Sequence, residues 1–515
     1  MTRDARSTHA QRRLGGHDKD MALPLLSNPR SWTGHWWLPE DSVNKVPGVL
    51  TWEPGGGLTL RMIGGWPHRE VTEPVRGVRL THDRISGWPA VYGVAENKPI
   101  TLLNVQTLSA QTYHLGMSEG PDKLDVIAAT ALIGYHLGGD DDPVFVGGIA
   151  TIENMTAWSR QSAIENQMTF DVETSHFEGG EIRYNSQIES QRAEMLGVTA
   201  QLHHFLTVAD FEQTRGSTAI RVVERTSVEF SSAEPRPLRE WLGMLSDMSD
   251  LLSLSTLTAC TEITLHVWTP PTPEAYPDNH PLAHMRHQIE VYEERVVAPA
   301  PDEKVADLRR FVLTLDDLPF DELIPRWMDV KDKFAAARSM ILGLSYITDG
   351  YLQTRVITAV GAAEAFHRAL NVGAPMTKSE FEQVRKDTLG AVEPERKKWL
   401  AEQIARNEPS LRNRLLDLAR RPGIFMALLV PDAEKWAKEA MRARNGLSHE
   451  GRSEGHSLDD LNALVEVTRA VVILNLLAQL GVPAERLALG LQEHPVLSYA
   501  MRLGKERYAT DAETA

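Results

Sequence analysis

Residues 46–63 read VPGVLTWEPGGGLTLRMI, in which two runs rich in β-branched, aliphatic and aromatic residues surround a turn. The segment 53–57, Glu-Pro-Gly-Gly-Gly, contains the residues that tight turns favour, and the runs 46–52 and 58–63 alternate in the way that strands do. This stretch therefore predicts a β-hairpin.

Similar short runs continue on the C-terminal side of this hairpin, separated by glycine and proline. We expect strands at 75–80, 90–94, 100–107, 111–115, 125–137, 145–152, 167–174, 201–208, 220–230 and 262–268, and a helix at 238–257. So many short strands predict a sandwich-like or barrel-like β domain, which we place at residues 29–275.

The pattern changes after a proline-rich stretch. Five prolines between Pro270 and Pro281 oppose regular structure, and we interpret residues 276–304 as a linker. Apolar residues at helical spacing follow, which predicts an all-α domain at 305–500. We expect helices at 329–344, 351–370, 378–389, 393–406, 410–420, 432–444 and 458–480. The polar segment 1–28 is expected to be a disordered leader, and 501–515 a C-terminal tail. The fold class is thus α+β and multidomain.

Composition excludes several classes of protein. The single cysteine, Cys260, rules out a disulfide framework and a cysteine-based zinc site. The longest apolar stretch is interrupted by Asn475 and Gln479, so we expect no membrane span and a cytoplasmic protein. The net charge is −16, yet residues 376–452 contain 16 Lys and Arg against 12 Asp and Glu. This local excess is consistent with contact to a nucleic acid, and equally with solvated helix faces.

The hexapeptide Arg444-Asn445-Gly446-Leu447-Ser448-His449 carries the candidate chemistry. Histidine takes up or releases a proton near neutral pH, and arginine presents a fixed fork of donors to a phosphate. Because Gly446 disfavours helix, we expect Arg444 at a helix C-terminus and His449 in the turn beyond it. The alternative is structural, with Arg444 complementing the helix dipole and His449 a surface residue.

Several segments resemble one known family, and they occur in the expected order from about residue 32 to 480. In the N-terminal half, 32–40, 46–50, 126–136 and 154–159 resemble ApeA-type N-terminal domains. In the C-terminal half, 351–355 and 363–368 resemble the long helix of the HEPN domain of the same proteins, and 444–449 resembles the HEPN nuclease motif, Arg-x4-His.

This resemblance implies an anti-phage, abortive-infection protein. Its all-α HEPN bundle would be a metal-independent endoribonuclease that acts on host or phage RNA as a homodimer. Its β-rich domain would restrain the nuclease or bind a phage-derived trigger. Arg444 would hold the scissile phosphate, His449 would transfer the proton, and Asn445 would orient the pair. Glu364 on the long helix would position Arg444 or His449. The resemblance implies no cofactor and no metal.

A second hypothesis has the same fold without catalysis: the HEPN domain binds RNA or a protein, and Arg444 and His449 are structural.

We interpret three other groups of residues as structural rather than functional. His280, His284 and His287 have a spacing that metal ligands can show, but they adjoin the proline-rich stretch. We interpret the segment 140–142, Asp-Asp-Asp, as an acidic loop. Trp32, Trp36 and Trp37 are expected to be core residues rather than a stacking surface.

Overall fold

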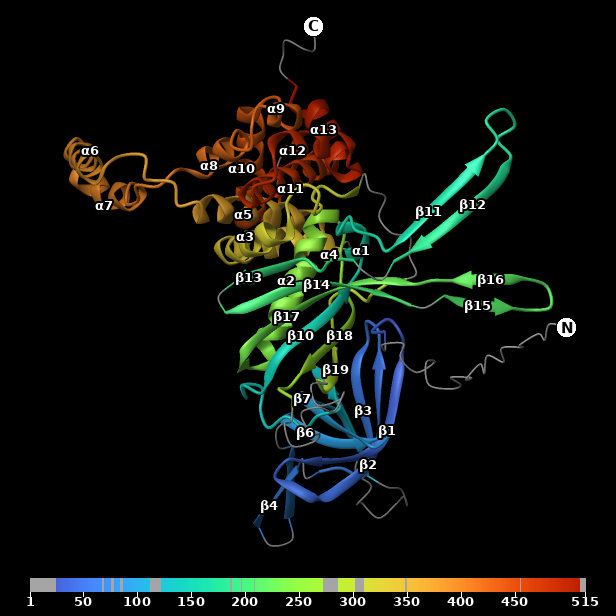
Figure 1. Ribbon diagram of the computed structural model, residues 1–515. Helices are drawn as coiled ribbons and strands as arrows, with labels where there is room; N and C mark the ends of the chain where they lie inside the picture. Colours follow the sequence, from blue (N-terminus) through green and yellow to red (C-terminus); the bar gives the residue numbers. More distant parts are fainter. Residues whose placement is uncertain are drawn as a thin grey trace, which may run out of the picture.

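A computed structural model describes residues 25–509 apart from 67–68, 76–77, 84–86, 112–121, 186–187, 196, 208, 272–285, 302–309, 348–349 and 454. The predicted α+β architecture is confirmed: the N-terminal half is a β-rich domain and the C-terminal half is helical (Figure 1). Of the expected leader, residues 1–24 lie outside the described part, and Leu26 is buried and donates its N–H to the carbonyl of Ile263.

Six antiparallel strands close into a barrel in the order β7-β6-β1-β2-β3-β8, with β8 pairing back onto β7. Their bounds are β1 (Arg30–Leu38), β2 (Asp41–Glu53), β3 (Gly57–Ile63), β6 (Gly87–Ala95), β7 (Lys98–Gln111) and β8 (Lys123–Ala128). The predicted hairpin at 46–63 is β2–β3, with Glu53 opposite Gly57.

Strand β7 joins the barrel to a larger sheet because its two halves have different partners. Residues 106–111 pair with β8, whereas Ile100–Leu103 pair with β9 (Thr130–Ile133). Between them Asn104 has a φ of 53°. The single strand predicted at 125–137 is therefore wrong: it divides into β8 and β9, one in the barrel and one in the extension.

The extension continues from β9 through β19, β18, β10, β17 and β14 to β13, so that thirteen strands of the described chain form one sheet. The bounds are β10 (Phe145–Ile152), β13 (Arg192–Met195), β14 (Val198–Leu206), β17 (Glu224–Arg236), β18 (Glu262–Trp268) and β19 (Gln288–Glu293). Strand β19 lies within 276–304, where a linker was expected, and it pairs with β9 and β18. Val291 and Tyr292 are buried there, and this burial outweighs the nearby prolines.

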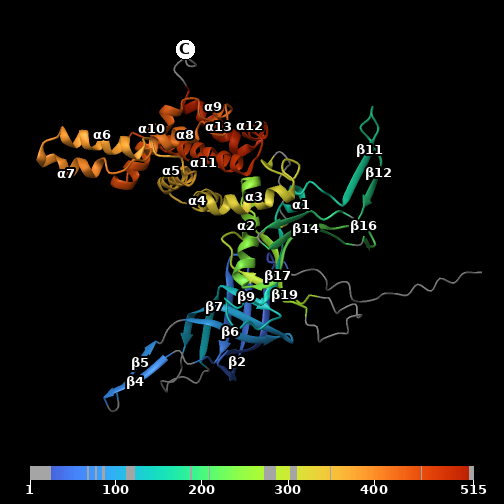
Figure 2. The same cartoon turned by 60° about the vertical axis from the view of Figure 1, so that its left-hand side comes forward.

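Three two-stranded hairpins complete the β domain: β4 (Arg69–Val75) with β5 (Val78–Asp83), β11 (Ile164–Phe170) with β12 (Phe177–Tyr184), and β15 (Asp210–Gln213) with β16 (Thr218–Arg221). The single strand predicted at 75–80 is wrong, because Val75 is the last residue of β4 and Val78 the first residue of β5. Figures 1 and 2 both show β11–β12 and β15–β16 reaching away from the body of the domain. Of the strand predicted at 111–115, residues 112–115 lie outside the described part.

Tryptophan side chains fill the β domain. Trp32 and Trp36 are completely buried and Trp37 nearly so, which confirms that they are core residues. The indole N–H of Trp36 donates to the carbonyl of Gly48 at 3.2 Å.

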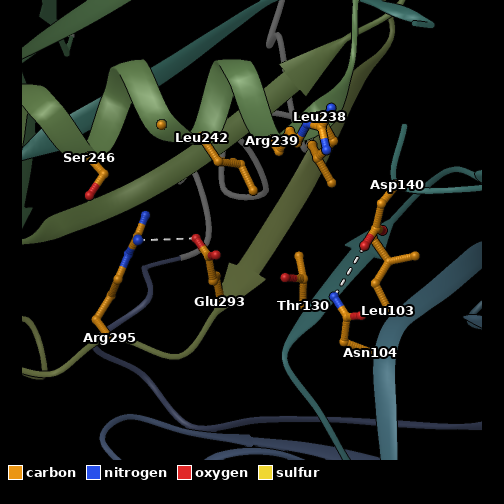
Figure 3. A pocket seen from close by; sticks show the side chains of 11 residues that line it. Leu103, Asn104, Thr130, Asp140, Leu238, Arg239, Leu242, Ser246, Glu293 and Arg295 are labelled. Carbon is orange, nitrogen blue, oxygen red and sulfur yellow. Dashed lines mark hydrogen bonds and ion pairs between the residues drawn. The ribbon is translucent and has the colours of Figure 1, made fainter. Parts of the chain in front are cut away.

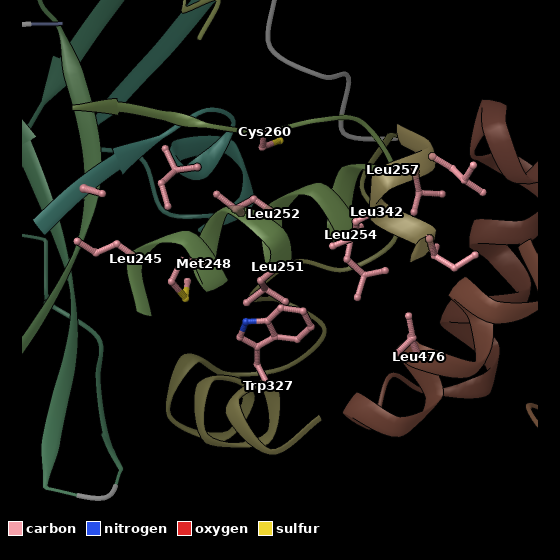
Figure 4. Packing of buried hydrophobic residues seen from close by; sticks show 14 of the residues in the cluster. Leu245, Met248, Leu251, Leu252, Leu254, Leu257, Cys260, Trp327, Leu342 and Leu476 are labelled. Carbon is pink, nitrogen blue, oxygen red and sulfur yellow. The ribbon is translucent and has the colours of Figure 1, made fainter. Parts of the chain in front are cut away.

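Helix α2 (Leu238–Thr256) connects the two domains, since it packs on the sheet on one side and on helices of the C-terminal domain on the other (Figure 4). Polar contacts reinforce this packing. The carboxylate of Asp247 accepts a hydrogen bond from Arg338 at 2.9 Å and forms an ion pair with Lys331, also at 2.9 Å. The hydroxyl of Tyr346 donates a hydrogen bond to Asp250 at 2.6 Å.

The helical domain contains α3 (Phe320–Lys333), α4 (Ala335–Tyr346), α5 (Leu352–Ala369), α6 (Lys378–Gly390), α7 (Pro394–Gln403), α8 (Leu411–Leu418), α9 (Met426–Leu429), α10 (Ala433–Glu450), α11 (Leu458–Leu480), α12 (Ala484–Glu493) and α13 (Pro495–Arg507); α1 (Met155–Trp158) is in the β domain. The helix predicted at 329–344 is wrong, because the chain breaks at Phe334 between α3 and α4. The expected tail 501–515 begins inside α13, and Tyr508 is buried.

Helix α11 forms the core of this domain. By length and composition it is the one described helix that could cross a membrane, but 83% of its apolar window is buried inside the protein. Helices α3, α4, α5 and α13 are among the helices that pack against it, so its apolar surface is covered by protein.

We predict that Gly93→Ala lowers the free energy of unfolding by about 1–3 kcal/mol, the usual cost of overpacking. A Cβ on Gly93 in β6 would lie 2.3 Å from the ring of buried Trp36. Gly179→Ala in β12 is the control, since a Cβ there meets nothing within 4 Å. Urea unfolding followed by tryptophan fluorescence measures both, and equal midpoints for the two variants would contradict the packing argument.

Candidate functional site

The hexapeptide lies inside one helix, because α10 runs without interruption from Ala433 to Glu450. The expected helix end at Arg444 is wrong. The Asp432 side chain caps the start by accepting from the N–H of Lys435 at 2.9 Å, and Gly451 ends the helix with a φ of 69°. Thus Gly451, not Gly446, supplies the left-handed residue that ends the helix.

Gly446 instead allows the chain after the helix to pack closely against α10. A Cβ at this position would lie 2.7 Å from the carbonyl oxygen of Arg452 and 3.5 Å from the Cα of Ser453. After Gly451 the chain folds back along α10, and it can do so only because residue 446 has no side chain. The bond of 2.9 Å between the Ser453 hydroxyl and Nδ1 of His456 holds the returning loop.

The buried face of α10 fixes the directions of the candidate residues. Trp436, Ala440, Ala443 and Leu447 are buried and recur at a spacing of three or four residues. An α-helix turns about 100° per residue, so Arg444 lies at the edge of this face, and Asn445 and His449 lie on the opposite side. The structure agrees, since Asn445 and His449 are exposed and Arg444 is intermediate.

Arg444 and His449 therefore diverge within one chain. Five residues along a continuous helix correspond to about 140° of rotation and about 7.5 Å of rise. The two side chains leave the same helix in different directions, so one copy of α10 does not bring both onto a single phosphate.

Arg444 is held by two neighbours. Its guanidinium donates to Oδ1 of Asn445 at 3.2 Å and lies 3.7 Å from Oε2 of Glu364 on α5. Glu364 also accepts a hydrogen bond, at 3.0 Å, from Arg368, which lies one turn further along α5. The structure thus brings together three of the four predicted residues, Glu364, Arg444 and Asn445.

His449 is separate from these three. It is exposed, and within the described chain it has no hydrogen bond or ion pair. An imidazole without a protein partner is available to a ligand, which suits a group that must exchange protons with a substrate.

Behind Glu364, ion pairs extend to α8. Arg368 pairs with Glu408 at 2.9 Å, and Glu408 pairs with buried Arg414 at 3.0 Å. Arg414 also approaches Nδ1 of His367 at 3.3 Å, and the other ring nitrogen of His367 lies 3.1 Å from Asp417.

The surroundings of these ion pairs shift the pKa of two of the residues. Burial lowers the pKa of His367, against the opposing effect of Asp417. The hydrogen bond to Glu364 raises the pKa of Arg368. Sequence reasoning missed these residues, although the spacing of Glu364 and Arg368 predicts a helical ion pair.

The described residues contain no group of three or more His, Cys, Asp or Glu side chains that could hold a metal ion. His287 bonds to the carbonyl of Gly134 at 2.9 Å, while His280 and His284 lie outside the described residues. In the acidic loop, Asp140 accepts from Asn104 at 3.1 Å and Asp141 pairs with Arg239 at 2.6 Å.

Two family models match the chain. One is ApeA N-terminal domain 1, over residues 31–327, which is more than half of the chain. The chain belongs to this ApeA family. The other is Apea-like HEPN, over residues 357–486. No curated protein and no solved structure matches the chain.

The candidate residues fall within one of the two matches. All four candidate residues, Glu364, Arg444, Asn445 and His449, lie within the HEPN match. The N-terminal match extends beyond β19 to residue 327, in α3. This pair of domains supports an anti-phage HEPN effector.

The ApeA-type domain contains a hollow of about 360 Å³ between α2 and strands β7, β9 and β19 (Figure 3). Asn104 donates to Asp140 at 3.1 Å, and Arg295 lies 3.1 Å from Glu293, but Oδ1 of Asp140, Oε2 of Glu293 and Nε of Arg295 are buried without a hydrogen-bond partner in the described chain. Burial raises the pKa of Glu293. The hollow lies in the other domain from Arg444 and His449, so it forms no part of their site.

We predict that Gly446→Ala destabilises the HEPN domain by about 1–3 kcal/mol, because the added Cβ meets the Arg452 carbonyl. Gly343→Ala in α4 is the matched control: its Cβ meets nothing within 4 Å. Alanine there should stabilise the helix by up to about 1 kcal/mol. Thermal unfolding of the two variants should therefore shift in opposite directions, and a stabilised Gly446→Ala variant would show that the returning loop is not closely packed.

Proposed function

We propose that this chain is an anti-phage effector whose HEPN domain is a metal-independent endoribonuclease. The observation that carries the proposal is that one helix, α10, presents both an exposed histidine without a partner in the described chain, His449, and an arginine held by Glu364, Arg444. These residue types supply what RNA cleavage needs, since RNA brings its own nucleophile.

The proposed reaction is an in-line displacement at phosphorus. The 2′-oxygen of the ribose attacks the adjacent phosphorus, and the bond from phosphorus to the 5′-oxygen breaks. A base removes the proton of the 2′-OH, and an acid gives a proton to the departing 5′-oxygen. The products are a 2′,3′-cyclic phosphate and a 5′-hydroxyl, and no cofactor is needed.

Each residue has a proposed role. His449 transfers the proton, and Arg444 binds the scissile phosphate and stabilises the charge that it gains. Asn445 bonds to Arg444 at 3.2 Å, which orients the guanidinium. Glu364, at 3.7 Å from Arg444, limits its movement from the other side.

We further propose that the active form is a homodimer formed through the HEPN domain. Its support is the divergence of Arg444 and His449 on α10. Two copies that meet through the exposed side of α10 can place Arg444 of one copy near His449 of the other, which one copy cannot do.

In this proposal the ApeA-type domain controls the nuclease, and the RNA substrate is host or phage RNA in the cytoplasm. The support for this control is that helix α2 packs against both domains. Helix α2 is buried against the sheet and against α3 and α4, with Asp247 and Asp250 bonded to Arg338, Lys331 and Tyr346. A displacement of the sheet therefore acts directly on the helices that support the HEPN bundle.

The trigger is proposed to bind the β11–β12 hairpin. Strand pairing places five exposed apolar side chains on one face of it: Met168, Phe170, Phe177, Ile182 and Tyr184. Residues 164–184 contain five acidic side chains and one Arg, a net charge of −4. Such a face fits a phage-derived protein whose own surface is apolar with a basic rim.

We predict that His449→Ala abolishes cleavage of total RNA in EDTA by about 10²–10⁴-fold, the usual contribution of general acid–base catalysis. His35→Ala, an exposed histidine of β1, is the control and should cleave as the wild type does. Gel analysis and detection of cyclic phosphate ends measure the activity. Equal cleavage by His449→Ala and wild type would remove His449 from the mechanism. A large fall in melting temperature would favour the structural role.

We predict that Phe170→Ser with Ile182→Ser removes RNA cleavage during phage infection. Both side chains are more than half exposed, so stability should change by less than about 0.5 kcal/mol per site. Gln167→Ser with Thr169→Ser, on the opposite face of the hairpin, is the matched control. Cleaved RNA from infected cells measures the response, and normal cleavage by the Phe170 and Ile182 variant would place the trigger site elsewhere.

A further inference from the structure

Helices α6 and α7 form an arm that has no core of its own. The arm is inserted between α5 and α8, and both views show it reaching away from the bundle (Figures 1 and 2). The structure describes every residue of α6 and α7, and none of them is buried. Isolated helices of this length are marginal in water, so the arm is expected to gain stability from another surface.

The chemistry of the arm fits a protein surface. Trp399 is 64% exposed, Val384 48% and Met376 42%. Residues 376–406 contain seven Lys and Arg against six Asp and Glu, so the arm is nearly neutral. A surface that binds the phosphates of RNA needs a clear excess of positive charge, and this arm has none.

The same domain contains an apolar hollow of about 630 Å³, lined by Ala419, Ile424, Met426, Ala427, Val430 and Pro431. Ile424 is 96% exposed, which is unusual for so large an apolar side chain. Arg420, Asp432 and Glu434 also line the hollow, and Glu434 already pairs with Arg412 and Arg420. Asp432 has no ion pair in the described chain, and on the arm Arg396 and Lys398 are close to Trp399 in the sequence of α7, so Asp432 is available to a positive charge of the arm.

We propose that the arm of each copy docks in the hollow of a second copy of this chain, with Trp399 against Ile424. The inference rests on the proposed dimeric nuclease and names the surfaces that hold it together. Because both surfaces are present on each chain, the exchange is reciprocal and forms two equal contacts.

The base of the arm is linked to the candidate site. Asn407 and Met376 bond to each other across this base, at 2.7 and 3.3 Å. The next residue, Glu408, pairs with Arg368, which pairs with Glu364, the neighbour of Arg444. Docking of the arm therefore fixes the residues that orient Arg444, and it brings the second copy of α10 into the same assembly.

The test compares Trp399→Asp, Ile424→Asp and their equimolar mixture by sedimentation velocity and mass photometry. Wild type is expected to be a dimer, and each variant alone should show at least a tenfold weaker dimer, because both contacts are altered. The mixture should form dimers again, since a Trp399→Asp chain and an Ile424→Asp chain together keep one unaltered arm and one unaltered hollow that can meet. Val43→Asp, at a β2 residue that is 92% exposed, is the control and should remain dimeric.

The outcomes separate this inference from the proposed function. Dimeric variants, or a mixture that stays monomeric, would overturn the arm exchange while leaving the nuclease intact. A monomeric wild type that still cleaves RNA would overturn both the dimer and the exchange, but not the role of His449. If Trp399→Asp stays dimeric and loses binding to a labelled 20-nucleotide RNA, the arm binds RNA and the proposal is wrong. Unchanged melting temperatures show that the variants fold.

Discussion

The burial of helix α2 on two sides is the constraint on which the rest of the structure depends. Leu245 and Leu252 face the sheet, whereas Leu254 and Leu257 lie toward the C-terminal helices, and Trp327 packs beneath Leu251 (Figure 4). The hydroxyls near its end bond within the helix, as Ser255 does to the carbonyl of Leu251. Burial raises the pKa of Asp250 and of Tyr346, which share a short hydrogen bond. The bond between Tyr346 of α4 and Asp250 of α2 is made only when both domains are in place, so it couples them.

Local patterns predicted the elements whose determinants are local. The β2–β3 hairpin follows from its turn residues, and α11 was predicted at 458–480 from its apolar spacing. In the structure Ser457 and Asp460 form a capping box at its start, and Gly481 ends the helix with a φ of 92°. Barrel closure did not follow, since it depends on β8 pairing with a strand that precedes it and on the bend at Asn104. Strand β19 was missed because proline signals near it are strong, and its burial between β9 and β18 cannot be read from its neighbours.

At the candidate site, too, the sequence predicted some features and not others. The residue types of the motif and the role expected of Glu364 were available from the sequence and the family resemblance. The geometry was not. Gly446 costs a helix about 1 kcal/mol relative to alanine, which predicts an end. The structure shows that this cost is offset by the returning loop, which packs where a side chain would be. The ion pairs from Arg368 to Asp417 were also beyond prediction, because they join α5 to residues about 40–50 positions later.

The continuity of α10 carries the strongest consequence for the proposed mechanism. If the helix ended at Arg444, a flexible turn could bring His449 back toward the arginine within one chain. In the observed helix the angle between the two side chains is fixed by backbone hydrogen bonds, and changing it would require breaking the last turns of α10. In the proposed mechanism, a rigid divergence of this kind would make catalysis depend on association, because the complementary residue would come from another copy. Such a nuclease would be limited in the cell by the population of the correct dimer, which a movement of α2 or of the arm would alter. The proposed restraint and the proposed chemistry would then both follow from the geometry of α10.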